Sequence, residues 1–195
     1  RCTPQVHGAS RNALSHVQEL VDIEINSVTD NPIILDNDTA VSGGNFHGQP
    51  LAMSLDYLKV AAAEIGNISD RRSYLLLEGL HGLPEMLSEN PGLNSGFMIT
   101  QYTTAALVSE NKSLCFPSSA DSIPTGMGQE DHVSMGSISA RKCLEVINNL
   151  EDKDLEKILK YFGDERDAKA ISKNIGRIRS SKKIDTKDLV NIIER

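Results

Sequence analysis

The stretch from residue 51 to residue 80 is the feature that most constrains the fold of this 195-residue chain. It contains no proline, and its apolar residues recur close to the 3.6-residue period of an α-helix. They are Leu55, Leu58, Ala62, Ile65, Leu75 and Leu76. Three small residues, Ala61–Ala63, would let another helix approach closely, and Gly79, Gly82 and Pro84 predict where the helix ends. One long helix therefore organises the chain.

Three further segments have helical patterns. Residues 5–25 carry an apolar stripe, residues 96–111 lie between a glycine and a proline, and another helix is predicted to begin near Glu130–Asp131 and to run through Ile147. Acidic residues at that start suit the positive end of a helix dipole. No segment has a convincing strand pattern. We expect an all-α protein, a bundle of long helices.

Two polar segments interrupt the helices, at residues 27–50 and 118–128. Both are rich in residues that form local turns and break helices, such as Asn, Asp, Gly and Pro. The first is expected to be a long ordered loop or a set of short extended pieces. Loops of this length inside compact domains are uncommon and usually functional.

The charge distribution divides the chain. Residues 146–195 contain 12 basic and 10 acidic residues, whereas residues 1–145 contain 8 and 17. The apolar residues of the tail predict three short amphipathic helices, one of them carrying Ala168, Ile171, Ile175 and Ile178. We therefore expect two units, residues 1–145 and 146–195. The acidic first unit argues against a nucleic-acid surface there.

Several classes of site are not expected. The three cysteines and five histidines are scattered without metal-ligand spacing, so we predict ordinary thiols and no metal. No stretch approaches the roughly 20 apolar residues of a membrane span. The sequence begins at Arg1 without a methionine or a signal-peptide core. We expect a cytoplasmic protein whose first residue lies inside a longer fold.

Four segments stand out as candidates for chemistry: residues 1–8, 42–48, 92–98 and 129–136. In the second, glycines surround Phe46 and His47, which allows close backbone approach. This loop either presents Phe46 to a ligand or is a glycine-rich turn with a packed phenylalanine. A phosphate-binding loop is disfavoured because no P-loop lysine is present.

The fourth segment contains Glu130, Asp131 and His132 in a row. Consecutive residues on a helix point in different directions, so they cannot all face one substrate. One partly buried carboxylate could act as a general base, or the segment is simply an acidic first turn. A hydrolase built from Ser134, His132 and Asp131 would lack a nucleophile elbow.

These four segments, in this order and approximate spacing, resemble the histidine ammonia-lyases of the aromatic amino acid lyase family. Ser27-Val28-Thr29-Asp30-Asn31-Pro32 and Gln129-Glu130-Asp131-His132 are among the motifs, and the resemblance covers about residues 1–145. It implies elimination of ammonia from L-histidine to give urocanate, in histidine catabolism. The family uses an electrophilic methylidene-imidazolone made from an internal Ala-Ser-Gly, and it forms homo-oligomers with composite active sites.

The resemblance also implies residue roles. Arg1 matches the arginine that pairs with the substrate carboxylate, and Phe46 matches the aromatic beside the electrophile and the substrate. Glu130 matches the glutamate at the imidazole end of the pocket, and Gln129 its polar neighbour. The sequence contains no Ala-Ser-Gly, so we expect no electrophile and no lyase activity from this chain alone. Gly126-Met127-Gly128 stands where the family more often has Ser-Ala-Asn.

The tail resembles something else. Residues 155–166 and the basic helix after them are similar to the small helical domain of the ribosomal RNA cytosine N-methyltransferases. The cofactor-binding sheet of those enzymes has no counterpart here, so methyl transfer is not expected. Two alternatives to a lyase remain: a noncatalytic fragment or fusion that acts as an assembly module, and an RNA-binding helical module formed by the tail.

Overall fold

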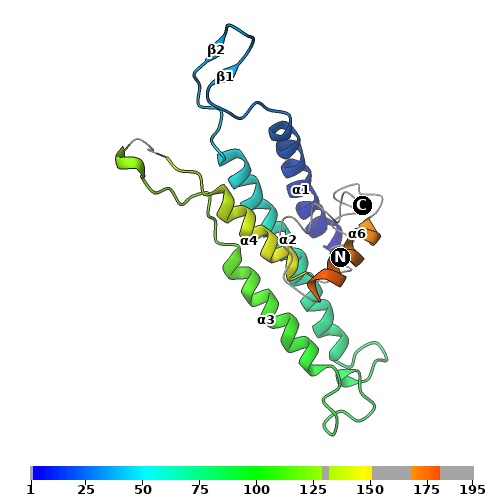
Figure 1. The fold of residues 1–195 in the computed structure, drawn as a ribbon. Coiled ribbons are helices and arrows are strands. Elements are labelled where there is room, and N and C mark those ends of the chain that lie inside the picture. The colour runs from blue at the N-terminus through cyan, green and yellow to red at the C-terminus, as the bar shows by residue number, and fades with distance from the viewer. Residues whose placement is uncertain (1, 129–131, 151–167, 181–195) are drawn as a thin grey trace.

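The computed structural model describes residues 2–128, 132–150 and 168–180. These residues are predominantly helical, as the sequence predicts. The long helix α2 lies at the centre, and three other helices pack along it (Figure 1). The helices of this bundle are α1 (Thr3–Ile25), α2 (Gln49–Leu77), α3 (Met98–Leu114) and α4 (Gly136–Asn148). None of the helices in these described ranges is long and apolar enough to cross a membrane.

Helix α2 confirms the strongest sequence prediction, with small shifts of its ends. It starts at Gln49, with Pro50 in the first turn, where a missing N–H costs nothing. Its last residue is Leu77, and Gly79 follows in the left-handed conformation with φ of 72°, as expected for a glycine just past a helix end. The predicted apolar residues Leu75 and Leu76 are half-exposed.

The close helix approach predicted at Ala61–Ala63 is confirmed. All three alanines are buried, and Ala62 and Ala63 form a core cluster with Val146 and Leu150, which lie on α4 and just beyond its end. Near this contact Asn149 Nδ2 donates to Asn111 Oδ1 over 3.0 Å, which links α4 to α3. Small side chains on α2 therefore let its neighbours pack directly against it.

The first polar segment contains short extended pieces, one of the two alternatives that the sequence predicted. Two short strands, β1 (Ile33–Ile34) and β2 (Ala40–Val41), pair in antiparallel fashion, Ile33 opposite Val41. Strands of two residues are too short to show a period-2 pattern, so their pairing could not be predicted. Asn45 Nδ2 then donates to the Val28 carbonyl over 2.6 Å and closes the base of this ordered loop.

The start of α4 corrects a second prediction. The helix begins at Gly136, and not near Glu130–Asp131, because residues 132–135 have non-helical backbone. The Gly136 N–H donates to Ser134 Oγ over 3.2 Å. A serine hydroxyl that binds a backbone N–H two residues later favours a turn over a helix. Acidic residues before this turn were therefore misleading as a helix start.

A charged pair is buried between α2 and the α3–α4 connection. Lys59 Nζ lies 2.6 Å from Asp56 Oδ1, and the Lys59 side chain is 0% exposed. Lys59 also donates to the Phe116 carbonyl over 2.9 Å, and Asp56 Oδ2 accepts from the Ser119 N–H over 2.8 Å. Burial is tolerated because each charge has an opposite charge and a backbone partner.

Two cysteines lie near this pair, and all three cysteines are free thiols, as predicted. Burial raises the pKa of the Cys143 thiol to about 12, and it also raises the pKa of Cys115. Since the thiolate is the reactive form, both cysteines serve as small packing residues.

In the tail the structure describes one of the three predicted helices, α6 (Ala168–Arg179). Ser172 and Ile175 are buried, whereas Lys173 and Arg177 are exposed, so this helix is amphipathic as expected. The other two predicted tail helices lie outside the described residues.

Substitution of Gly96, just before α3, tests the backbone conformation and the close contact at this position. Its φ is 49°, and a Cβ built there would lie 2.1 Å from the Met86 carbonyl oxygen. Gly92 has φ of 96° but nothing within 4 Å. Gly92→Ala should cost about 1–2 kcal/mol for the left-handed conformation, and Gly96→Ala a further ~1–3 kcal/mol for the overlap. Urea unfolding measures both, and equal losses would contradict the contact.

The buried Asp56–Lys59 pair makes the free energy of unfolding depend on pH in the acid range. Burial alone would raise the pKa of Asp56, but Lys59 and the Ser119 hydrogen bonds outweigh it and lower this pKa to about 2, from 3.8. A carboxyl group whose pKa is lower in the folded than in the unfolded state stabilises the fold at pH values above its unfolded-state pKa. This stabilisation disappears as pH falls from about 4 to 2. The free energy of unfolding should drop by about 2 kcal/mol over this window because of Asp56.

Chemical denaturation at pH values from 5 down to about 2 checks this expectation. Asp56→Asn should flatten the decline and should be less stable at pH 7, because Lys59 loses its counter-charge. Asp38→Asn is the matched control, since Asp38 is exposed in the first loop. An unchanged acid slope in Asp56→Asn would show that the buried pair is not responsible.

Candidate functional site

Of the four predicted site residues, the structure describes Phe46. Arg1, Gln129 and Glu130 lie outside the described residues. Phe46 sits in the turn just before α2, and its side chain is not covered, with 55% of the residue exposed. An uncovered aromatic ring at a glycine-rich turn fits presentation to a ligand better than core packing.

The loop that carries Phe46 is bound to the segment that follows Glu130. His47 Nε2 lies 2.9 Å from the His132 carbonyl oxygen, and the two imidazole rings stack with centroids 5.4 Å apart. The other ring nitrogen, Nδ1, accepts the Gln49 N–H over 3.1 Å. The structure therefore brings together two of the four candidate segments, which are 85 positions apart at this contact.

Glycines permit the backbones to meet at this point. A Cβ added to Gly48 would lie 3.0 Å from Ser134 Oγ, and one added to Gly136 would lie 3.3 Å from the Gly48 carbonyl oxygen. Gln49 Nε2 also donates to the Ser119 carbonyl over 2.9 Å. Three loops thus converge on the first turn of α2, and residues 42–48 are held by more than their own turn.

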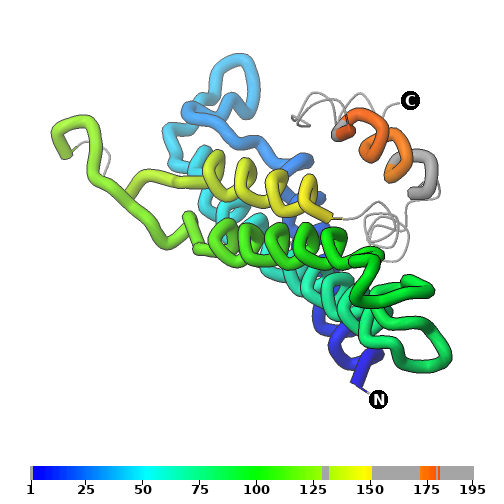
Figure 2. Tube along the Cα trace, turned by 90° about the horizontal axis from the view of Figure 1, so that it is seen from below, coloured from blue at the N-terminus to red at the C-terminus, as the bar shows by residue number. Residues whose placement is uncertain are grey.

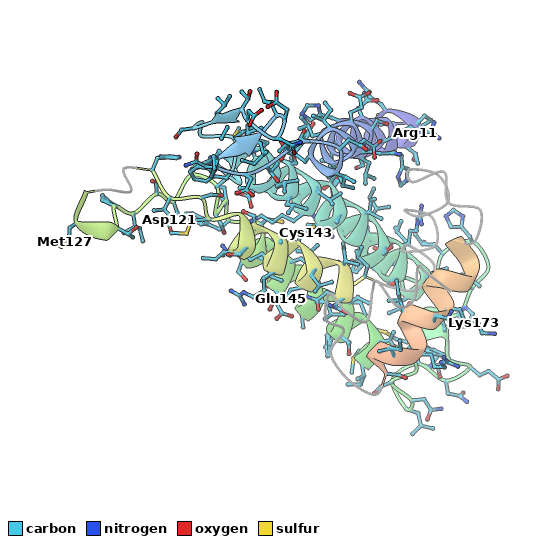
Figure 3. All side chains as sticks on the ribbon, turned by 45° about the horizontal axis from the view of Figure 1, so that its top comes forward. Arg11, Asp121, Met127, Cys143, Glu145 and Lys173 are labelled. Atoms are coloured by element: carbon cyan, nitrogen blue, oxygen red, sulfur yellow. The ribbon has the colours of Figure 1, made fainter. Side chains whose placement is uncertain are left out.

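Residues 119–128 project away from the bundle, with Met127 at their outer end (Figure 3). Gly126, Met127 and Gly128 all have positive φ, between 58° and 87°, and Met127 is fully exposed. Three consecutive left-handed residues favour glycine at two of the positions. The departure from Ser-Ala-Asn therefore has a backbone reason.

Helix α1 begins far from the loop that leads into α2. It starts at Thr3 and has 23 residues, which corresponds to about 34 Å. Its C-terminal end, and not its start, lies on the side of the loop that leads to α2 (Figure 1). The start of α1 and this loop therefore lie towards opposite ends of the helix.

A pocket at the opposite end of α2 was not predicted from the sequence. It has a volume of about 380 Å³ and lies between the C-terminal part of α2, the turn at residues 85–87 and the start of α3. Its lining is Tyr74, Leu77, Glu78, Glu85, Met86, Met98, Gln101 and Tyr102. Met98 is the last residue of the third candidate segment, and this was the available sequence signal for the pocket. The periodicity of apolar residues predicts helices but carries no information about such a pocket.

Comparison with known proteins identifies the family of this chain. The family model for aromatic amino acid lyases matches residues 1–153. This chain belongs to the aromatic amino acid lyase family. It is 59% identical over 151 residues to a histidine ammonia-lyase of Alkaliphilus oremlandii and 58% identical over 152 residues to one of Symbiobacterium thermophilum. These matches cover 76% and 77% of this chain and 30% of each relative.

Solved structures agree with this membership in the lyase family. The histidine ammonia-lyase of Trypanosoma cruzi is 41% identical, with a TM-score of 0.73, and the match covers 100% of this chain and 41% of that one. A phenylalanine aminomutase of Pantoea agglomerans is 29% identical, with a TM-score of 0.74, over 100% of this chain and 36% of that one. The chain thus spans about 30% of the length of the curated relatives.

A second family model, described as the MraW methylase family, matches residues 133–195. The two matches overlap over residues 133–153, which include α4. The tail is therefore similar to a methylase family, in line with the change in charge after residue 145.

Proposed function

We propose that this chain supplies substrate-binding residues of a histidine ammonia-lyase, which eliminates ammonia from L-histidine to give urocanate. The contact between the Phe46 loop and the segment after Glu130 carries the proposal, because it joins two family motifs on the described surface. The identity of 56–59% to several histidine ammonia-lyases supports the histidine-specific assignment.

The proposed roles follow the chemistry of the substrate. The Arg1 guanidinium would bind the substrate carboxylate through two parallel hydrogen bonds. Glu130, with Gln129 beside it, would bind the imidazole end and take part in proton transfer. Phe46 would lie against the flat substrate and help to exclude water. Removing a weakly acidic β-proton requires that these groups be held in fixed geometry.

The electrophile would come from outside this sequence. In this family a methylidene-imidazolone activates the amino group as a leaving group, and it forms from an Ala-Ser-Gly that the 195 residues do not contain. The exposed face of Phe46 is compatible with an aromatic neighbour of such a group, since 55% of this residue is uncovered. The chain alone would bind substrate weakly at most and would not turn it over.

We also propose that the functional form is a homo-oligomer. The start of α1 and the Phe46 loop lie at opposite ends of a 23-residue helix, so residues from different copies would complete one pocket. Apolar side chains exposed on α1 and α2 could bury their surface between copies. They include Ile23, Met53, Tyr57, Val60 and Leu75.

A chimera tests the catalytic assignment. The matched part of this chain would replace the corresponding 30% of the Alkaliphilus oremlandii enzyme, and urocanate formation from L-histidine would be followed by its near-ultraviolet absorbance. The chimera should be active, whereas the 195-residue chain alone should produce no absorbance rise. In the chimera Glu130→Gln should lower kcat by about 10²–10⁴, as expected for loss of an acid–base group.

Glu89→Gln is the matched control, because Glu89 is an exposed carboxylate beyond the 85–87 turn, and it should leave kcat unchanged. A correctly folded oligomeric chimera that forms no urocanate would refute the assignment. Equal losses in Glu130→Gln and Glu89→Gln would refute the role of Glu130.

As a second candidate function we propose RNA contact by residues 146–195, favoured by the methylase-family match. On α6 the buried Ser172 and Ile175 oppose the exposed Lys173 and Arg177, and an exposed basic face can bind phosphates. The acidic residues 1–145 offer no such surface, so we place any RNA contact beyond residue 145.

Binding of a ribosomal RNA fragment at several salt concentrations tests this second function. Lys173→Gln with Arg177→Gln should weaken binding and reduce the salt slope by about one for each phosphate that the variant no longer binds. Lys112→Gln, on exposed α3 surface, is the control. No salt-sensitive binding, or binding that survives deletion of residues 151–195, would exclude this function.

A further inference from the structure

We propose that His47 is a positioning residue that sets the place of Phe46 relative to residues 132–135, which follow Gln129 and Glu130 in the sequence. This proposal rests on the proposed lyase function for its catalytic meaning, but its structural part stands on contacts within the described residues. His47 is bonded to Phe46 in the chain, and His132 follows Glu130 by two residues.

The hydrogen bonds of His47 define one protonation form. Nδ1 accepts the Gln49 N–H over 3.1 Å, so this nitrogen must have a free lone pair. Nε2 therefore carries the ring proton and donates it to the His132 carbonyl oxygen 2.9 Å away. A neutral imidazole with its proton on Nε2 thus makes both bonds at once, and neither bond is possible if the two nitrogens exchange roles.

The two bonds have separate structural effects. The bond at Nδ1 satisfies a free N–H in the first turn of α2, which fixes the imidazole to the helix start. The bond at Nε2 reaches a different segment, 85 positions later in the chain. His47 is consequently the link between a rigid helix, the loop before it and the segment that leads into α4.

Other contacts favour a definite arrangement over a loose one. The His132 ring stacks on His47 with an angle of 26° between the ring planes. Gly48 and Gly136 lie where an added Cβ would come within 3.0–3.3 Å of the opposing segment. Since Phe46 is attached directly to His47, loss of the Nε2 bond should release the Phe46 ring even if α2 is unchanged.

Two substitutions of His47 distinguish its two hydrogen bonds, because each removes one bond and retains the other. In His47→Asn the short amide oxygen can still accept the Gln49 N–H in a local turn, but it cannot reach His132. In His47→Gln the longer amide can donate to the His132 carbonyl in place of Nε2, but the acceptor for Gln49 is lost. His16→Gln is the control, since His16 is an exposed histidine on α1 that faces Tyr57.

The first measurement uses the 195-residue chain itself. The chain contains no tryptophan, so Phe46→Trp introduces a single tryptophan at the position of interest, which can be excited selectively over the four tyrosines. We expect His47→Asn to lower the fluorescence anisotropy of this reporter, with Gln49 amide exchange unchanged. His47→Gln should retain the anisotropy and accelerate Gln49 amide exchange about two- to tenfold, the effect of one hydrogen bond. His16→Gln should change neither.

Nitrogen chemical shifts of the imidazole provide a direct check. They should show the form of His47 with its proton on Nε2 in the unsubstituted chain. The opposite tautomer, or equal effects of the two His47 variants on both readouts, would overturn the proposal, because side-chain volume alone would then explain the results.

The active chimera supplies the catalytic readout. There His47→Asn should lower kcat more than tenfold with a smaller change in KM, and His47→Gln should restore most of kcat. An inactive chimera with intact anisotropy and exchange differences would refute the lyase function and leave the positioning contact standing. An active chimera in which both variants match the parent would refute the positioning role alone.

Discussion

The position of the loops depends on one buried ion pair, Asp56 with Lys59 on α2. A lysine whose side chain is 0% exposed is stable only if its charge is compensated nearby. Asp56 provides the charge, and the backbone of the α3–α4 connection provides the rest, through Phe116 and Ser119. The pair therefore pins the point at which the chain leaves α3 and turns towards α4. Lys142, from α4, donates to the same Phe116 carbonyl.

From this anchor a line of polar contacts runs towards the start of α2. The Ser119 N–H binds Asp56, and the Ser119 carbonyl accepts a hydrogen bond from the side-chain amide of Gln49. The backbone N–H of Gln49 in turn donates to His47 Nδ1. His47 then reaches His132. Helices α3 and α4 lie alongside α2 (Figure 2), and the line of polar contacts fixes loops that apolar packing leaves uncovered. Directional bonds suit this task because they specify register as well as proximity.

The sequence was informative where structure is local. Apolar periodicity predicted α1 and α2 to within a few residues, and the flanking glycine and proline did so for α3. The alanines of α2 predicted the close approach of another helix, which is α4. It failed where the outcome depends on distant partners. Asp56 and Lys59 look like an ordinary surface pair one helical turn apart, and their further partners come from the α3–α4 connection, far along the chain. The start of α4 was misplaced because Ser134 competes for the backbone. The link from His47 to His132 joins residues 85 positions apart, which no local pattern reveals.

The proposed homo-oligomer follows from the direction of α1, whose start lies away from the loop that leads into α2. A helix is stiff over its whole length, so neither end of α1 can move towards the other without breaking its hydrogen bonds. Substrate groups only a few ångströms apart cannot bridge about 34 Å of helix. The same long helices that hold the Phe46 loop in place therefore keep the first residues away from it. In the proposed homo-oligomer, neighbouring copies packed along the exposed apolar faces would complete the pocket while α1 stays straight.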